Sequence, residues 1–316
     1  MGGQDKINQT TITTFILFGF AGYQELQLLL FLTFLVIYVI TMAGNLLLIV
    51  LVAADLQLHS PMYFFLGNLS FLEICYTSTI LPRMLSSLLT GDRSISVGGC
   101  LVQYYFFGSL ASTECYLLAV MSYDRYLAIC KPLHYSFLMN RRLCFSLIIA
   151  SWVSGIVSNT IITCLELQLS FCGPREIEHF FCDMAPVVKL SCSYTHIVET
   201  VTFILASMDT IPPFLLTVIS YVCILTNILQ LQSRTMRKKA FSTCSSHLIV
   251  VTLFYGSLII VYLIPKANSL KKLHQTFSLF YTVLTPMVNP LIYSLRNREV
   301  KKTSKLRALP AQDIVP

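Results

Sequence analysis

The stretch that decides the fold class is "LQLLLFLTFLVIYVITMAGNLLLIVLV", Leu26 to Val52, which carries no charged side chain. An α-helix rises about 1.5 Å per residue, so about 20 apolar residues cross the hydrocarbon core of a bilayer. Six further apolar stretches of comparable length follow, approximately Met62 to Leu88, Val97 to Ala128, Leu143 to Thr163, Ile197 to Leu231, Ala240 to Leu263 and Thr276 to Leu295. The sequence therefore predicts an all-α membrane protein, a bundle of seven transmembrane helices.

The composition supports this fold class. Of 316 residues, 55% are hydrophobic and 12% are charged, and the mean hydropathy of +0.70 lies outside the usual range of soluble globular domains. The first 25 residues lack the features of a cleaved signal peptide, so we expect none. We expect three parts: an extracellular N-terminal tail at 1–25, a seven-helix domain at 26–295 and a cytoplasmic C-terminal tail at 296–316.

The distribution of basic residues predicts the orientation, because Lys and Arg are retained on the cytoplasmic side of a membrane. With the N-terminus outside, fourteen of the 22 Lys and Arg residues fall on the cytoplasmic side. The net charge of +7 then reflects basic clusters beside the anionic lipid of the bilayer, and we expect no nucleic-acid partner.

Each tail carries one further signal. Asn8-Gln9-Thr10 is a glycosylation sequon on the tail that we expect outside. The opposite tail begins at Arg298 with a basic, amphipathic stretch. This stretch fits a short helix on the inner leaflet, and a disordered polar tail is the alternative.

The cysteines predict extracellular disulfides. Most of the eleven lie in spans or on the cytoplasmic side, where they pack as small apolar residues. Cys100, Cys172, Cys182 and Cys192 fall outside, where an oxidising compartment favours two disulfides with three alternative connectivities. His179 lies close to Cys182 and makes a zinc site the competing interpretation, but thiols exposed to an oxidising exterior more readily form disulfides.

Two carboxylates lie at one depth inside the predicted bundle. A mid-helix acid costs about 2.5 to 3.5 kcal/mol on insertion scales and usually faces a polar interior or a partner. Glu73 and Glu114 both lie roughly 16 to 18 Å from the cytoplasmic end of their helices. With Asn45 and Asn289 they predict a polar layer. We hypothesise a sodium ion or a shared proton between the two acids; the alternative is two protonated carboxyls bonded to backbone or water.

A third acid, Asp209, lies on one face of the fifth span with Thr202, Leu205 and Ala206. It precedes Pro212-Pro213, where we expect the backbone ladder to be broken. The carboxylate is a candidate for binding a polar or amine group of a ligand. A structural acid near a helix break is the alternative.

The pair Asp124-Arg125 lies at the predicted cytoplasmic end of the third span, in "MSYDRYLAIC", Met121 to Cys130. Alone, such a pair is typical of a solvated helix end. Together with "NPLIY", Asn289 to Tyr293, it resembles the rhodopsin-like G-protein-coupled receptors. Further motifs make the chain similar to the olfactory receptors over nearly its whole length: "PMYFFLGNLSFLEICY" at Pro61 to Tyr76, "FCGPREIEHFFCD" at Phe171 to Asp183, "KAFSTCSSHL" at Lys239 to Leu248 and "PMVNPLIYSLRN" at Pro286 to Asn297.

The resemblance implies an odorant receptor of the plasma membrane. Its ligand would be a small volatile odorant, and its partner a stimulatory heterotrimeric G protein that raises cyclic AMP. It implies the disulfides Cys100–Cys182 and Cys172–Cys192. It also implies a G-protein switch in which Arg125 acts with Asp124, Tyr221, Asn289 and Tyr293.

The resemblance also directs attention to a ligand pocket, which for a volatile ligand is a mostly apolar cavity between helices. The sixth span reads "FYGS", Phe254 to Ser257, so Tyr255 would lie beneath the ligand. Gly108, Ala111 and Ser112 are small and would leave room. The candidates are Phe107, Gly108, Ala111, Ser112, Leu205, Ala206, Asp209, Tyr255, Leu258, Ile259 and Tyr262. Simple packing between helices is the alternative for each of them.

Two departures and three rivals complete the interpretation. Glu73 replaces the Asp that is common in the family, and the sixth span lacks the mid-helix Trp and Pro of the wider receptor class. A receptor for an amine or fatty acid would rest on Asp209. A transporter would use the buried acids as an ion path, but the chain has no internal repeat. We expect neither an enzyme nor a cofactor beyond the sodium ion, because no catalytic motif is found.

Overall fold

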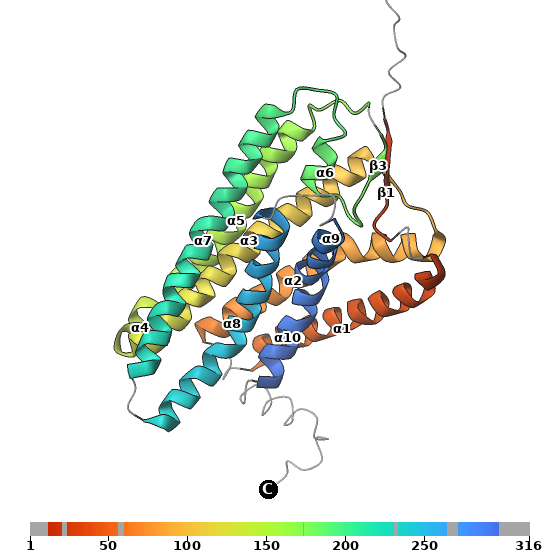
Figure 1. Cartoon of the computed structure of the whole chain (residues 1–316). Helices are drawn as coiled ribbons and strands as arrows, with labels where there is room; N and C mark the ends of the chain where they lie inside the picture. Colours follow the sequence, from red (N-terminus) through yellow and green to blue (C-terminus); the bar gives the residue numbers. More distant parts are fainter. Residues whose placement is uncertain are drawn as a thin grey trace, which may run out of the picture.

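Seven long helical segments run side by side in the computed structural model, which describes residues 12–20, 24–55, 60–172, 174–230, 233–263 and 271–296 (Figure 1). The first six are α1 (Gln27–Ala54), α2 (Pro61–Thr90), α3 (Val97–Cys130), α5 (Arg141–Glu166), α7 (His196–Gln230) and α8 (Arg234–Leu263). The seventh consists of α9 (Lys271–Leu279), the π-helical turn Phe280–Leu284 and α10 (Thr285–Arg296). All seven predicted spans are helical.

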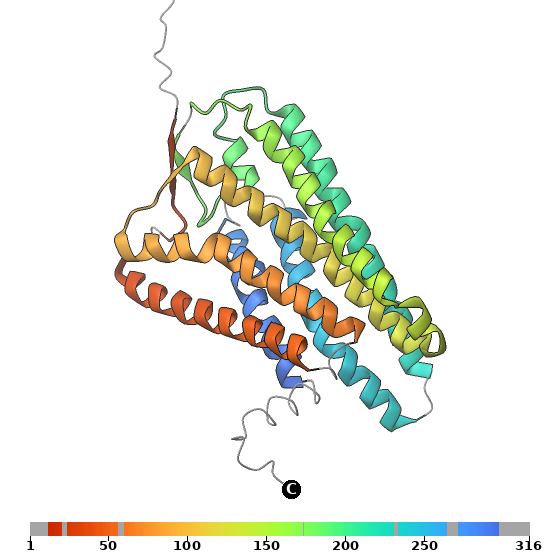
Figure 2. The same ribbon diagram turned by 180° about the vertical axis from the view of Figure 1, so that it is seen from behind.

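Within the described residues, five helices are long and apolar enough by themselves to cross a membrane, namely α1, α2, α5, α7 and the part of α8 from Cys244 to Val261. The third segment differs because it lies in the middle of the bundle, packed against α2, α5, α7 and α8 (Figures 1 and 2). It buries Gln103, Thr113 and Ser122 among other polar residues. Such a helix needs little apolar surface facing lipid.

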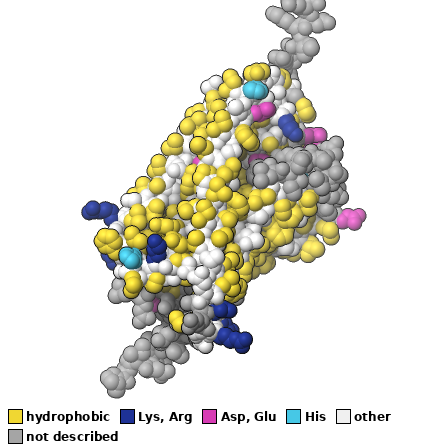
Figure 3. All heavy atoms as spheres, turned by 60° about the vertical axis from the view of Figure 1, so that its left-hand side comes forward, with side chains coloured by type: hydrophobic (Ala, Val, Ile, Leu, Met, Phe, Trp, Pro, Cys, Tyr) yellow, Lys and Arg dark blue, Asp and Glu magenta, His cyan; other side chains and the backbone are white. Residues whose placement is uncertain are grey.

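The outer surface of the bundle is apolar. On α7, the side chains of Phe203 and Met208 are 74% and 64% exposed, and α1 exposes Leu28 by 68%. Figure 3 shows hydrophobic side chains over most of the visible face, with Lys and Arg gathered mainly at the end where α4 lies in Figure 1. Exposed apolar helix faces in this number are those of a protein whose solvent is lipid.

A small sheet departs from the all-α prediction. Its strands are β1 (Thr14–Leu17), β2 (Ser94–Ser96) and β3 (Glu176–Ile177), in the order β2-β1-β3. β1 is antiparallel to β2 and parallel to β3. Strands this short carry no alternating pattern, and their partners lie far apart in the sequence, so the sequence did not reveal them. The described end of the expected N-terminal tail is therefore part of the fold.

Two short helices were also not predicted, α4 (Pro132–Leu138) and α6 (Met184–Val188). The fifth span corrects another expectation, since α7 continues as one helix through Pro212 and Pro213. The tertiary contacts of α7 along its length outweigh the two missing backbone donors.

Both disulfides implied by the resemblance are present. Cys100 at the start of α3 bonds to Cys182, with 5.4 Å between Cα atoms, and Cys172 bonds to Cys192, with 5.9 Å between them. They fasten the long loop between α5 and α7 over the bundle. Phe180 and Phe181 of this loop are buried in the core of the bundle.

Four expectations lie outside the described residues. They concern the sequon at Asn8, the C-terminal tail with its amphipathic helix, and the side chains of Tyr262 and Tyr293.

Candidate functional site

The part of the candidate site that is expected to hold the ligand is an aromatic cluster between α3, α7 and α8. The Tyr255 hydroxyl of α8 donates a hydrogen bond of 2.9 Å to the backbone oxygen of Cys115 on α3. Its ring lies 5.2 Å from that of Phe214 on α7. Tyr255 is fully buried, so it joins three helices at the depth where the sequence analysis places the floor of the pocket.

Phe107 forms the side of this cluster that faces the long loop. Its ring lies 4.8 Å from Phe181 of the loop, 5.4 Å from Tyr76 on α2 and 6.2 Å from Tyr281 in the π-helical turn. Ala111, one turn further along α3, and Leu258 on α8 are partly buried against the same core. The structure therefore brings Phe107, Ala111, Tyr255 and Leu258 to one apolar core.

Two of the three small residues of α3, Gly108 and Ser112, do not leave the room that the sequence analysis expects. A Cβ added to Gly108 would collide with the side chain of Asn159 on α5. The Asn159 amide donates a hydrogen bond of 3.2 Å to the Ser112 hydroxyl and one of 3.0 Å to the backbone oxygen of Gly155. Gly108 and Ser112 are thus small because a neighbouring helix fills the space, and this corrects their interpretation as an opening for ligand.

Asp209 is engaged within the bundle. Its carboxylate is buried and accepts hydrogen bonds from the Tyr116 hydroxyl on α3 at 3.1 Å and the Ser158 hydroxyl on α5 at 2.5 Å. It therefore links α3, α5 and α7, as the structural alternative expects. Of its predicted neighbours, Leu205 is half-buried and Ala206 is exposed.

Ile259 on α8 is also exposed, by 38%. The candidates Ala206 and Ile259 thus lie at the surface of the bundle, because a helix in a bundle presents one face to its neighbours and another to its surroundings. Sequence spacing places them near Asp209 and Leu258 but does not settle which way each one points.

The predicted polar layer is partly assembled. Glu73 on α2 accepts a hydrogen bond from the Asn289 amide on α10, and Asn45 on α1 donates 3.1 Å to the backbone oxygen of Pro286. Glu114 is fully buried, and within the described part of the chain neither of its oxygens has a hydrogen-bond partner. The layer therefore joins three helices directly, while Glu114 lies in it unpartnered.

This arrangement is compatible in chemistry with the expected cation. Three buried carboxylate oxygens, one from Glu73 and two from Glu114, have no donor among the described residues. Hard cations take oxygen ligands of this kind. The described residues contain no group of three or more His, Cys, Asp or Glu side chains that could hold a metal ion, so hydroxyls, amides or water would complete any coordination.

The cluster of Arg125, Tyr221 and His247, where α3, α7 and α8 meet, contains a residue that the sequence analysis did not single out, His247. The Tyr221 hydroxyl on α7 lies 2.6 Å from Nδ1 of His247 on α8, and the two rings are stacked 5.8 Å apart. Both side chains are buried, and Arg125 on α3 lies close enough for its charge to act on them. The signal in the sequence was the polar His247 in "KAFSTCSSHL", which an apolar span would otherwise exclude.

Asp124 has a partner other than its neighbour Arg125. Its carboxylate accepts a hydrogen bond of 2.8 Å from the Tyr135 hydroxyl on α4. Within the described chain, Asp124 and Arg125 form no ion pair. Burial raises the pKa of Tyr135, and the Asp124 charge raises it further, so the phenol stays protonated and keeps donating. The contact fixes α4 against the end of α3.

Comparison with known proteins identifies the family. A family model described as olfactory receptor matches residues 34–309. The chain is 48% identical to human olfactory receptor 11L1 over 295 residues, which cover 93% of this chain and 92% of that protein. It is 48% identical to mouse olfactory receptor 5AP2 over 304 residues, 96% of each chain, and 49% identical to human olfactory receptor 6B1 over 298 residues, 94% of this chain and 95% of that one.

These matches confirm the predicted resemblance, the seven-helix receptor architecture that the family implies and the multi-pass location in the plasma membrane. They also confirm that the chain is a receptor and not an enzyme. The chain belongs to the olfactory receptor family of G-protein-coupled receptors.

Proposed function

We propose that the protein binds small volatile odorants between its helices and activates a stimulatory, olfactory-type heterotrimeric G protein, which raises cyclic AMP. The observation that carries this proposal is the way α8 is attached. One buried hydrogen bond, from Tyr255 to Cys115, holds α8 to α3 beside the apolar core. Another, between Tyr221 and His247, holds α8 to α7 near Arg125.

A ligand in this site would contact the apolar core at Phe107, Ala111, Tyr255 and Leu258. A ligand that displaces the Tyr255 ring changes the attachment of α8 at one end, and the same rigid helix carries His247 at the other. Activation is then a shift in population towards a conformation with α8 moved outward, and the ligand drives it only by its difference in affinity for the two states.

The proposal places the N-terminus and the long loop outside the cell. The two disulfides support this orientation, since disulfides persist in oxidising compartments. The orientation is also supported by the excess of Lys and Arg in the loops on the side of the membrane opposite the N-terminus. Asp124, Arg125, Tyr221, Asn289 and Tyr293 would then form the cytoplasmic switch.

The polar layer would link the two ends. We propose that a sodium ion or a shared proton balances the carboxylates of Glu73 and Glu114, whose unpartnered oxygens are otherwise costly to bury. Glu114→Gln removes one charge and keeps the shape. The variant should lose any dependence of the odorant response on sodium, measured as dose–response curves in sodium and in choline buffers, and a sodium effect of unchanged size would refute the cation.

The test of the main proposal is a screen of volatile compounds on cells that express the receptor with a stimulatory G protein and a cyclic AMP reporter. We expect a dose-dependent response to at least one class of small apolar volatile, and loss of that response in Tyr255→Ala. A surface-expressed receptor that responds only to amines, with a response that depends on Asp209, would contradict it. Asp209 already accepts two protein donors, which speaks against an amine receptor.

A further inference from the structure

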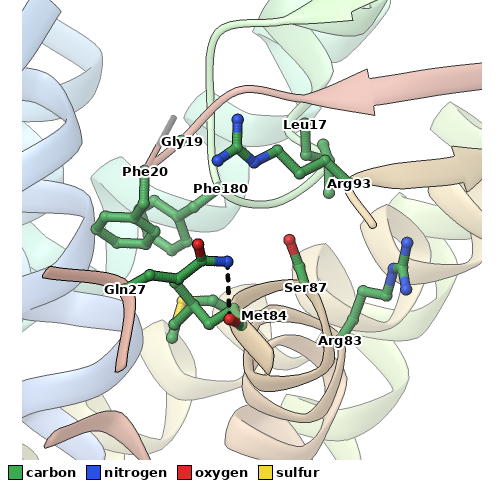
Figure 4. A pocket seen from close by; sticks show the side chains of 10 residues that line it. Leu17, Gly19, Phe20, Gln27, Arg83, Met84, Ser87, Arg93 and Phe180 are labelled. Atoms are coloured by element: carbon green, nitrogen blue, oxygen red, sulfur yellow. Dashed lines mark hydrogen bonds between the residues drawn. The ribbon is translucent and has the colours of Figure 1, made fainter. Parts of the chain in front are cut away.

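A cleft at the end of the bundle that carries the small sheet has the features of a second ligand site. It lies between the end of β1, the first turn of α1, the last turns of α2 and the long loop (Figure 4). The space measures about 430 Å³, a volume that includes the open solvent at its mouth. Its lining residues Met84, Leu88 and Phe180 belong to the same core as Tyr255, but Tyr255 itself does not line the cleft.

Arg93 supplies a positive charge to this cleft. Its backbone is fixed, because the Leu17 amide of β1 donates 2.9 Å to the Arg93 carbonyl oxygen. Its side chain is half-buried and has no hydrogen-bond or ion-pair partner within the described chain. Figure 4 shows the guanidinium extending across the opening, near Phe180. A guanidinium in this position presents its paired N–H donors to a planar oxyanion.

Arg83, the other basic residue of the lining, is engaged elsewhere. Its guanidinium lies 3.9 Å from the Asp92 carboxylate and donates to the backbone oxygens of Asp92 and Ser94. In Figure 4 it turns away from the space. Arg83 therefore holds the loop before β2, and the charge left available to a ligand is that of Arg93.

The remaining walls divide into one polar point and an apolar surface. Among the described residues, the Ser87 hydroxyl has no hydrogen-bond partner, and it points into the space (Figure 4), whereas Gln27 already donates 2.8 Å to the Leu88 backbone oxygen. The rings of Phe20 and Phe180, 5.7 Å apart, form the apolar wall. A single cation beside two aromatic rings matches a molecule with one anionic end and an apolar body.

We propose that this cleft binds a small carboxylate with a short hydrocarbon chain, its carboxylate on Arg93 and Ser87 and its chain against Phe20 and Phe180. The hydrocarbon is needed because an exposed charge pair alone contributes little affinity. The carboxylate is needed because the partner-free guanidinium would otherwise face an apolar wall.

The test uses the full-length receptor in nanodiscs of zwitterionic lipid, with hexanoate as the probe and 1-hexanol as its neutral counterpart. Binding is read by saturation-transfer NMR without G protein, so the result is independent of the proposed signalling function. We expect Arg93→Gln to weaken hexanoate binding at least about tenfold by removing charge-assisted hydrogen bonds, with hexanol unaffected. Arg175→Gln is the matched control, since it removes an exposed charge that does not line the cleft.

Two further variants keep the proposal falsifiable if Arg93→Gln folds poorly. Arg93→Lys keeps the charge but loses the paired donors and should weaken hexanoate about threefold, and Ser87→Ala should do so by a similar factor. Equal hexanoate affinity in wild type and all three variants would overturn the proposal. Displacement of hexanoate by an equal concentration of inorganic phosphate would overturn the assigned carboxylate and chain.

Discussion

The helix contacts of this receptor are of two kinds. α3, α5 and α7 are fastened by buried polar contacts among Asn159, Ser112, Ser158, Tyr116 and Asp209, and Gly155 lets α5 approach the backbone of α3. By contrast, among the described residues α8 meets α3 and α7 at two buried hydrogen bonds, one at each half of the helix, and at one exposed hydrogen bond from Arg237 to the Leu229 backbone oxygen. The difference separates a fixed frame, formed by α3, α5 and α7, from α8, which can move when a few hydrogen bonds break.

The first prediction tests α8 at the end that lies near Arg125. Arg125→Ala should reduce the odorant-stimulated cyclic AMP response more than about tenfold, because it removes the half-buried charge beside Tyr221 and His247. Surface expression should stay close to wild type. Arg141→Ala, at the exposed start of α5, is the control and should signal normally. Normal signalling by Arg125→Ala would show that the cluster of Arg125, Tyr221 and His247 serves only in packing.

The second prediction tests the fixed frame. In Gly155→Ala, the new Cβ would collide with the Thr113 side chain and the Ser109 backbone oxygen, so the free energy of unfolding should fall by about 1 to 3 kcal/mol. Thermal unfolding of the purified receptor measures this. Gly256→Ala on α8 is the matched control, because a Cβ there meets nothing within 4 Å. Equal stability of the two variants would remove the distinction between frame and moving helix.

The third prediction concerns a variant that breaks the hydrogen bond between α8 and α7. His247→Phe keeps an aromatic ring of similar size but leaves the Tyr221 hydroxyl buried without its partner, which costs about 1 kcal/mol. If this bond holds α8 in place, basal cyclic AMP should rise about fivefold without ligand. His274→Phe on α9, which bonds to the Val261 backbone, tests whether loss of any buried histidine has the same effect. Unchanged basal activity in His247→Phe would contradict the assignment.

The fourth prediction concerns a variant that breaks the hydrogen bond between α8 and α3, and it has the smallest expected effect. Tyr255→Phe removes one hydroxyl, but the Cys115 oxygen that it leaves lies within the backbone hydrogen bonding of α3. Basal cyclic AMP should rise only about twofold to threefold, and the odorant dose–response curve should shift to lower concentration. Phe254→Leu, next to it, keeps every hydrogen bond. A shift of the Tyr255→Phe curve to higher concentration would mean that the hydroxyl serves the ligand instead.

Most of the fold was accessible from hydropathy. The first span, Leu26 to Val52, and the six that follow are helices within a few residues of their expected ends. The disulfides Cys100–Cys182 and Cys172–Cys192 followed from the family motifs, since spacing left three connectivities open. The three-stranded sheet was not accessible, because strands of two to four residues from 14–17, 94–96 and 176–177 acquire their pattern only on pairing.

The site was less accessible than the fold. Periodicity placed Gly108 and Ser112 on one face of α3, but only the structure shows that Asn159 of α5 fills that face. Asp209 was recognised as an unusual acid, and its partners Tyr116 and Ser158 lie on two other helices. His247 was visible in its motif, yet nothing along the chain paired it with Tyr221.

The sequence by itself determined that this chain is a seven-helix membrane protein, because transfer of apolar side chains into lipid depends on each segment's own composition. That it is a receptor followed from the resemblance of its motifs to a family. The tertiary structure alone decided which polar groups satisfy one another. Successive residues turn by about 100° around a helix, so spacing identifies which residues share a face but not which neighbour that face meets. Whether Gly108 opens a pocket or receives Asn159 depends on how α3 and α5 are rotated in the bundle.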